Sequence, residues 1–465
     1  MRNTSFKQLI LVTVIVTLTF TCGTGMYFSC IYRMTGYFAP ETADLFAECI
    51  CYVAQAVGMF LTAVLVRLKV RFTGGRFFFP VIAVLTVLSG IPAFLTEDGA
   101  LVAAVFVISS VLEGVSQGLY FLLIVTAVPK DKRLWAFGIS YTVSPIITAL
   151  LALIGEGAFV KSGYALILYF VMAAAACILW QFVVPVYPAR EVKPVSTIRL
   201  DKGGMNPVLI ATFFFIAVTW AVQSVAFYFP IAQMDELEMS GELLRITYSL
   251  GLIAATWINN RDKRIGSICC LVTMTAPMLY ILLQTKVGVT TIVFFICYFM
   301  TGFLAVYRFG IVADLSDMVS DKGLPLIYLC SFGIIFGRLG EAAGAYIGIS
   351  LTSDPLALMA VTSVLLVFGS GVFMFHYIKL FSPVPKSEMT RDDVLASIKL
   401  TYDLSSREMD VLNLLVDGAT NTEIAGKLFI SENTVKFHVS NLLKKTNAKS
   451  RKELSSKFLE QLTGK

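Results

Sequence analysis

The chain has 465 residues, of which 57% are hydrophobic and only 15% are charged, and its formal net charge is +6. Soluble domains carry about 25% charged residues, so this composition excludes an ordinary soluble globular protein. A mean hydropathy of +0.78 indicates a membrane protein, and the length allows two or three domains.

Twelve apolar runs follow one another within the first 378 residues. Each is close to the roughly 20 residues that a helix needs to cross a bilayer. The first run is too long for a signal peptide and lacks a small-residue cleavage site, so we expect it to be a true span. Run 243–258 has the weakest signal. The runs are 6–28, 43–66, 77–95, 101–128, 134–154, 164–184, 208–230, 243–258, 265–283, 290–307, 325–349 and 356–377.

The charges between the runs predict the orientation. The segments on the same side of the membrane as Met1 carry 18 Lys or Arg, with Arg308 counted among them, whereas the segments on the opposite side carry four. Basic loops stay in the cytoplasm. We therefore expect a multi-pass protein of the bacterial inner (cytoplasmic) membrane with both termini in the cytoplasm.

The spacing of the loops indicates an internal repeat. The longest predicted cytoplasmic loop, 186–206, separates six spans from six, and basic loops at 67–76 and 259–266 follow the second span of each half. A parallel repeat places its loops in this way. The arrangement resembles the major facilitator superfamily, whose loop after span 2 has an Asp before a Gly-Arg pair. Gly75-Arg76 matches the pair, but the Asp is absent.

Polar side chains inside the spans are costly unless they are paired or face a cavity. Glu113 and Gln117 lie four residues apart on the fourth span, and Gln223 lies on the seventh. One hypothesis is that these three line a central cavity for a small ligand, since the resemblance implies that spans 1, 4, 7 and 10 surround it. The alternative is that they only hydrogen-bond between helices. Arg338 and Glu341, three residues apart, are expected to pair.

Residues 379–402 are predicted to be a cytoplasmic linker. Two prolines, Pro383 and Pro385, interrupt any helix near its start. A short helix over Arg391–Lys399 is expected to follow and to pack on the tail through an apolar face that includes Ile398.

The tail, residues 403–465, is predicted to hold four short helices. Ser405, Thr420 and Ser450 each stand three residues before a Glu, which is the capping-box signature of a helix start, and Ser431 caps the remaining helix. The expected helices are 406–417, 421–428, 432–446 and one after Ser450. A short helix, a tight turn and a longer helix are typical of a helix-turn-helix.

The third of these helices has an apolar stripe through Val435, Val439 and Leu442, which leaves polar and basic residues on its other face. The region Lys427–Lys457 has a net charge of +6, which attracts phosphates. The stretches LSSREMDVL and NTEIAGKLFISENTVKFH resemble the LuxR/NarL-type helix-turn-helix at nearly every position.

That resemblance implies DNA binding as a homodimer paired through the last helix, Arg451 to Leu459. It implies that Thr434, Lys436, Phe437 and Ser440 approach bases or adjacent phosphates. Several relatives have Lys at the position of Ser440, which leaves the sequence preference open. Asn421 and Thr422, at a helix start, would contact phosphate. His438 fits a structural role at least as well as a DNA contact. The full predicted DNA-binding set is Asn421, Thr422, Thr434, Lys436, Phe437, Ser440, Asn441, Lys444 and Lys445.

Together these patterns predict an all-α protein with a twelve-span membrane domain (1–378), a linker (379–402) and a helix-turn-helix domain (403–465). The expected function is a membrane-bound one-component transcriptional regulator, whose partners are double-stranded DNA, an unknown small-molecule ligand and the lipid bilayer. No cofactor, metal site or catalytic group is expected, since only two histidines and no catalytic motif are present. The alternatives are a transporter with a regulatory tail, and a scaffold that holds DNA at the membrane.

Overall fold

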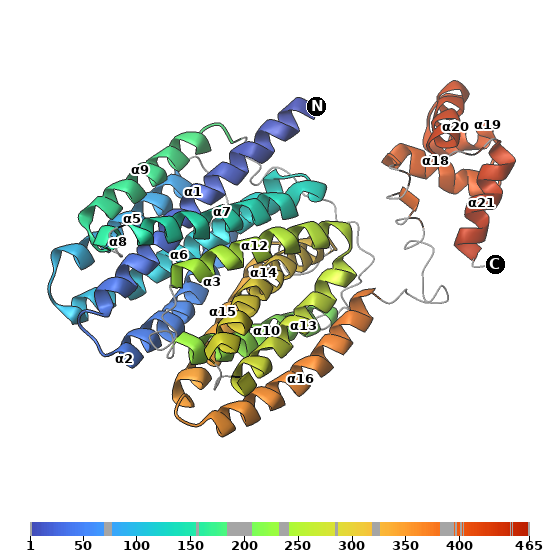
Figure 1. Ribbon diagram of the computed structural model, residues 1–465. Helices are drawn as coiled ribbons and strands as arrows, with labels where there is room; N and C mark the ends of the chain where they lie inside the picture. The colour runs from blue at the N-terminus through green and yellow to red at the C-terminus, as the bar shows by residue number, and fades with distance from the viewer. Residues whose placement is uncertain are drawn as a thin grey trace. The chain divides into compact units, whose positions relative to one another are not determined.

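The computed structural model describes residues 2–68, 77–154, 158–183, 207–231, 241–283, 287–318, 326–381, 395, 398–399, 402, 404–446, 448 and 450–463. Within these ranges the regular structure is helical and contains no strand (Figure 1). The chain divides into two compact units. We call the larger one, which ends at Phe381, the membrane unit, and the smaller one, which contains residues 382–465, the tail unit.

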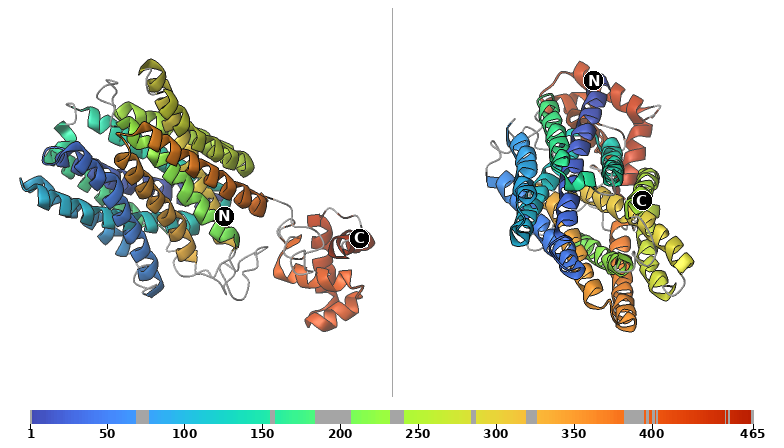
Figure 2. Two further views of the ribbon diagram at one scale, coloured as in Figure 1. Left: turned by 90° about the horizontal axis from the view of Figure 1, so that it is seen from below. Right: turned by 60° about the vertical axis from the view of Figure 1, so that its left-hand side comes forward.

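The membrane unit consists of long helices that run alongside one another (Figure 2). In chain order these are α1 (Arg2–Met34), α2 (Pro40–Asp44), η1 (Leu45–Ile50), α3 (Cys51–Leu68), α5 (Phe78–Leu95), α6 (Gly99–Ala127), η2 (Lys130–Lys132), α7 (Arg133–Leu153), α8 (Ala158–Lys161), α9 (Gly163–Trp180), α10 (Pro207–Ile231), α12 (Gly241–Arg261), α13 (Lys263–Leu283), α14 (Val287–Met318), α15 (Leu326–Ser350) and α16 (Pro355–Phe381).

The predicted spans lie on these helices. Among the described residues, nine helical segments are long and apolar enough to cross a membrane. The other three predicted spans correspond to α10, α12 and α15. The weakest prediction, 243–258, lies within α12, which carries Arg245 and Arg261 beside its apolar residues. The second span is formed by α2, the π-helical segment η1 and α3 in succession.

Several helices extend beyond the apolar runs that predicted them, α14 and α16 among them. α14 continues to Met318, although its run ends at Tyr307, so Arg308 is a helix residue and not a loop residue as predicted. α16 continues to Phe381, four residues past the end of its run at 377.

The two predicted halves of the membrane unit meet through two matching helix pairs. α3 packs against α15, and α7 packs against α12. Each pair joins the second span of one half to the fifth span of the other. The two pairs are therefore equivalent under the relation that superposes one half on the other. This is the arrangement expected of a 6+6 parallel repeat.

Glycine contacts repeat in the same way. A Cβ at Gly58 of α3 would collide with the Val111 carbonyl oxygen of α6, and a Cβ at Gly251 of α12 would collide with the Phe299 carbonyl oxygen of α14. In each half, therefore, the second and fourth spans approach so closely that only glycine fits between their backbones. Small residues permit this kind of packing between membrane helices.

We expect Gly58→Ala to destabilise the membrane unit by about 1–3 kcal/mol, because the added methyl overlaps a backbone atom that cannot rotate away. Thermal unfolding of the full-length protein in detergent measures the loss. The matched control is Gly371→Ala in α16, where a Cβ would meet nothing within 4 Å. Equal melting temperatures for the two variants would contradict the close α3–α6 contact.

The tail unit contains α18 (Ser406–Val416), α19 (Asn421–Leu428), α20 (Glu432–Thr446) and α21 (Arg451–Thr463). The predicted caps form. Ser405 Oγ accepts from the Glu408 backbone N–H at 3.2 Å, while Glu408 accepts from the Ser405 N–H at 2.7 Å. Thr420 and Glu423 form the same capping box. Ser431 and Ser450 each accept from the backbone N–H three residues on. Local side chains therefore set the helix starts.

Two turns use left-handed backbone. Gly418, which directly follows the predicted first helix 406–417, has φ +84°, and α18 itself stops at Val416. Phe429, in the turn between α19 and α20, has φ +52°. Left-handed dihedrals favour glycine, which this turn lacks, so Phe429 carries a conformational cost that the packing of the two helices must offset.

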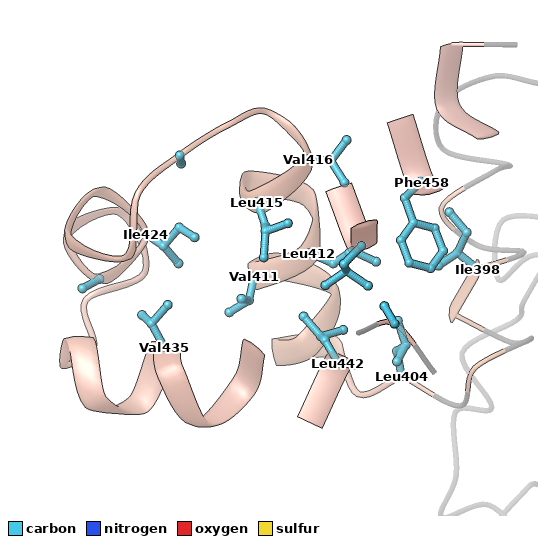
Figure 3. Close-up of a cluster of buried hydrophobic side chains, with 14 residues drawn as sticks. Ile398, Leu404, Val411, Leu412, Leu415, Val416, Ile424, Val435, Leu442 and Phe458 are labelled. Carbon is cyan, nitrogen blue, oxygen red and sulfur yellow. The ribbon is translucent and has the colours of Figure 1, made fainter. Parts of the chain in front are cut away.

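One apolar cluster joins all four tail helices (Figure 3). Val435 and Leu442 are fully buried and Val439 is partly buried, as predicted. Ile398 belongs to the same cluster, which confirms that this linker residue packs on the tail. Of the predicted helix Arg391–Lys399, only Leu395, Ile398 and Lys399 are among the described residues. The buried members from the four helices include Val411, Leu412, Leu415, Ile424, Val435, Leu442, Leu454 and Phe458.

Candidate nucleic-acid interface and buried polar centre

The face of α20 that points away from the tail core presents most of the predicted DNA-binding residues. Burial of Val435 and Leu442 fixes the rotation of the helix and leaves the opposite face to solvent. Phe437 is 61% exposed, so its ring is open to solvent on this face. Lys436, Phe437, Ser440 and Lys444 are exposed, and Thr434 and Asn441 are half-buried.

Lys445 points into a contact within the tail. Its ammonium donates to Glu408 Oε2 at 2.9 Å, and this links α20 to α18. The Glu408 carboxylate is 4% exposed and also accepts from the Ser405 backbone N–H. One carboxylate thus caps α18 and holds α20 in place.

The start of α19 is also tied to its neighbours. Asn421 Oδ1 accepts from Arg451 Nη1 of α21 at 2.6 Å, and Arg451 also donates to the Ala419 carbonyl. Thr422 Oγ1 donates to Glu432 Oε1 of α20 at 2.7 Å. The two residues predicted to touch phosphate therefore sit where α19, α20 and α21 meet. Sequence reasoning missed Arg451 and the second role of Glu408, because both depend on contacts between helices.

His438 is half-buried on α20, and its Nδ1 is buried without a hydrogen-bond partner among the described residues. Its ring lies 5.7 Å from that of Phe437. This placement fits the structural role that the sequence left open beside a DNA contact.

The groups around Glu408 shift the pKa of its carboxyl. Burial raises the pKa of this carboxyl, but the hydrogen bonds from Lys445 and from Ser405 outweigh it and leave the pKa below its ordinary value. The carboxylate form is therefore favoured in the folded tail.

The membrane unit contains a buried polar centre, formed by Gln55, Glu113, Gln117, Arg308, Arg338 and Glu341. Glu113 of α6 accepts from Gln117 Nε2 at 3.1 Å and from Gln55 Nε2 of α3 at 3.0 Å. Both Glu113 and Gln117 are buried. Gly23 of α1 leaves room for the carboxylate, because a Cβ there would lie 3.0 Å from Glu113 Cγ.

The polar centre crosses between the halves. Arg338 of α15 donates to Glu341 at 2.5 Å, which confirms the predicted pair. The same guanidinium donates to Gln117 Oε1 at 3.5 Å. A continuous polar chain therefore runs from Glu113 in the first half to Glu341 in the second. Within the described ranges, no three His, Cys, Asp or Glu side chains are grouped as metal ligands.

Arg308 belongs to this centre, and its assignment to a cytoplasmic loop was wrong. Its side chain is buried, Nη1 lies 4.0 Å from Glu341 Oε1, and the guanidinium stands 4.5 Å from the Trp220 ring centroid. The apolar residues after it, Phe309 to Ala313, were the signal that the helix continues. Removing Arg308 from the loop tally leaves 17 basic residues on that side.

Gln223 hydrogen-bonds to a different partner from Glu113 and Gln117. Its Nε2 donates to Thr301 Oγ1 of α14 at 2.7 Å, while its Oε1 is buried and lacks a partner among the described residues. The hypothesis that all three line one ligand cavity stays a prediction. Gln55, a single amide in the second span, completes the Glu113 site and was not predicted.

We expect Glu408→Gln to lower the free energy of unfolding of the tail fragment 382–465 by about 1–2 kcal/mol at pH 7, because it weakens two charge-assisted hydrogen bonds. The pKa of Glu408 is lowered on folding, so its contribution is present above its unfolded pKa of about 4.3 and is lost as pH falls through the folded value. Urea unfolding followed by circular dichroism between pH 7 and pH 3 measures both effects, and the Gln variant should lose less stability on acidification.

Asp410→Asn is the control for this pair. Asp410 lies 3.5 Å from Arg407, but its side chain is 50% exposed. Exposed ion pairs contribute about 0–1 kcal/mol. Equal losses in the two variants would show that the Glu408–Lys445 contact does not stabilise the tail.

The tail matches a known family. The model of the family described as "Bacterial regulatory proteins, luxR family" matches residues 403–458. The nitrate/nitrite response regulator protein homolog of Haemophilus influenzae is 50% identical over 58 residues, which are 12% of this chain and 28% of that protein. NarP of Escherichia coli, a nitrate/nitrite response regulator, is 50% identical over 58 residues, 12% of this chain and 27% of that protein.

A third relative, the CsgBAC operon transcriptional regulatory protein of Escherichia coli, is 55% identical over 53 residues, 11% of this chain and 24% of that protein. The chain thus spans about a quarter of the length of these curated relatives. The similarity concerns the tail.

The membrane unit is similar in fold to a solved transporter. A crystal structure of the nucleoside transporter NupG superposes with a TM-score of 0.52 at 11% identity, covering 81% of this chain and all 100% of that one. This likeness supports the major-facilitator-like fold expected from the sequence. Residues 403–458 are a luxR-type helix-turn-helix domain, carried by a chain whose membrane helices have a transporter-like fold.

Proposed function

We propose that the protein is a membrane-bound one-component transcriptional regulator, in which the membrane unit controls DNA binding by the tail. The observation that carries this proposal is the exposed polar and basic face of α20 on a luxR-type domain that belongs to the same chain as a membrane bundle. We place the protein in the inner membrane with both termini in the cytoplasm, where the tail can reach DNA. No enzymatic step is part of this proposal.

In this proposal α20 reads the major groove. Thr434, Lys436, Phe437 and Ser440 approach bases or nearby phosphates, and Lys444 and Asn441 contact the backbone further along. Asn421 and Thr422 at the start of α19 orient the domain on phosphate. Lys445 acts through Glu408 as a positioning residue, which supports the angle between α18 and α20. Two tails pair through α21.

Control by the membrane unit needs a ligand that distinguishes two states. The polar centre supports such a mechanism, because Gln117 in one half and Arg338 in the other are joined by a single long hydrogen bond of 3.5 Å. A small polar ligand that binds Glu113, Gln117 or Arg338 competes with this bond and shifts one half against the other. Gln223, with an unused buried oxygen, is available to the same ligand.

The buried polar centre also favours one alternative, a small-molecule transporter with a regulatory DNA-binding tail. Uptake of a substrate into vesicles, lost on Glu113→Gln, would support that alternative. A bundle in which these side chains only bond to one another would bind nothing and transport nothing.

We expect the double variant Lys436→Ala/Lys444→Ala to lose the specific chromatin peaks of the full-length protein. Base-reading contacts are worth about 1–3 kcal/mol each, and phosphate contacts contribute less. Chromatin immunoprecipitation with sequencing compares the variant with the wild type. Lys452→Ala, an exposed lysine on α21, is the matched control. Peaks that survive in the double variant would exclude α20 as the reading helix.

We expect Gln117→Leu to change promoter occupancy under constant growth conditions, because it removes the contact between the halves without changing the tail. The same chromatin measurement reports the change, and immunoblotting of membranes verifies equal protein levels. Gln181→Leu is the control, since Gln181 is an exposed amide outside the polar centre. If Gln117→Leu and wild type occupy the same promoters to the same extent, the polar centre does not control the tail.

A further inference from the structure

A second feature of the membrane unit lies far from the polar centre along α1. The start of α1 and the end of α9 enclose a pocket of about 430 Å³. Both helices are long and apolar enough to cross a membrane, and the pocket lies where α1 begins and α9 ends. A groove at the ends of two spanning helices faces the region where lipid headgroups meet acyl chains.

The lining of the pocket divides into two kinds of side chain. Ile10 and Val14 of α1, with Leu179 and Phe182 at the end of α9, make up most of an apolar wall. Ile10, Val14 and Phe182 are 49%, 40% and 69% exposed, so the wall is open to the surroundings of the bundle. The polar lining consists of Lys7 and Gln8, and none of the lining residues that the structure describes is acidic.

The amide of Gln8 gives the main evidence that this pocket binds a ligand. Its Nε2 is buried and has no hydrogen-bond partner among the described residues. A buried donor without an acceptor costs free energy, and a bound ligand that supplies the acceptor would remove this cost. Lys7, on the same turn of α1, adds a positive charge beside it. Together they form a site for an oxygen-rich anion.

We propose that this pocket binds a phospholipid with an anionic headgroup. The Lys7 ammonium and the Gln8 amide N–H bind a phosphate oxygen, and the apolar wall holds the first part of an acyl chain. A zwitterionic lipid also carries a phosphate, but its own cation competes with Lys7. A free phosphate has the same oxygens and gains nothing from Ile10, Val14 and Phe182. The site is separate from the polar centre and does not depend on the proposed function.

The test uses the full-length protein, purified in detergent and depleted of lipid. Thermal unfolding is followed by intrinsic fluorescence after adding phosphatidylglycerol, phosphatidylcholine or inorganic phosphate. We expect phosphatidylglycerol to raise the melting temperature more than phosphatidylcholine, and phosphate alone to have no effect. Equal shifts with the two lipids would overturn the anionic assignment, and a full shift with phosphate alone would overturn the lipid assignment.

Variants then assign the effect to the pocket. Lys7→Ala should weaken phosphatidylglycerol binding about fivefold, as expected for one lysine at an anionic headgroup. Gln8→Leu should raise the melting temperature of the lipid-free protein, because it removes the unpaired donor, and should abolish most of the extra shift with phosphatidylglycerol. A purely structural glutamine would give the opposite sign in the lipid-free protein.

Two further variants test whether the lipid effect comes from this pocket. Gln8→Glu keeps the size of the side chain and repels phosphate, so it should lose bound phosphatidylglycerol in native mass spectrometry even if Gln8→Leu folds poorly. Gln181→Leu removes an exposed amide that lies beside Leu179 and Phe182 but does not line the pocket. It should retain wild-type lipid binding. Retention of phosphatidylglycerol by Gln8→Glu, or its loss in Gln181→Leu, would refute the site.

Discussion

The cost of charge inside a bilayer is the constraint on which the membrane unit depends. Arg338 and Glu341 lie within a bundle that hydrocarbon surrounds, where an unpaired charge is expensive. They are tolerated because they pair at 2.5 Å, with Arg338 reaching Gln117 of the other half. Because an unpaired charge is costly in this environment, the two side chains lie next to each other and pair. The two halves are therefore joined by a polar contact at their centre, in addition to the apolar packing of α3 on α15 and α7 on α12.

A polar contact between the halves responds to a bound polar molecule differently from an apolar contact. Apolar packing between helices changes little when a solute enters, whereas a long hydrogen bond between Arg338 and Gln117 has competitors among polar molecules. The backbone contacts at Gly58 and Gly251 hold each half together internally.

The tail unit has a different arrangement, with polar and basic side chains on the outside of an apolar cluster. Its apolar cluster is small, and its helix starts are fixed by local caps in place of extensive packing. Glu408, a buried acid among these helices, takes two roles by capping α18 and binding Lys445 of α20. The basic and aromatic residues Lys436, Phe437 and Lys444 lie on the exposed surface of α20.

Much of this arrangement was predictable where the deciding interactions are local. Apolar runs of membrane length place the spans, and S/T-x-x-E signatures place the tail helices, because both depend on residues within a few turns of one another. The stripe through Val435 and Leu442 predicts which face of α20 is buried. The spacing of Arg338 and Glu341 predicts their pairing. The luxR-type pattern predicts the domain.

Tertiary structure decided what depends on contacts distant in sequence. Arg308 follows an apolar run and so resembles a loop residue, but Trp220 and Glu341, from two other helices, provide its buried environment. Gln55 joins Glu113, Gln223 bonds to Thr301, and Lys445 turns to Glu408, although none of these partners is fixed by spacing along the chain. The helices, their polarity and the kind of tail could be predicted from the sequence, since they depend on short-range periodicity and capping. The packing of the helices determines which polar groups form pairs. A buried side chain hydrogen-bonds to the groups that the fold brings within about 3 Å of it.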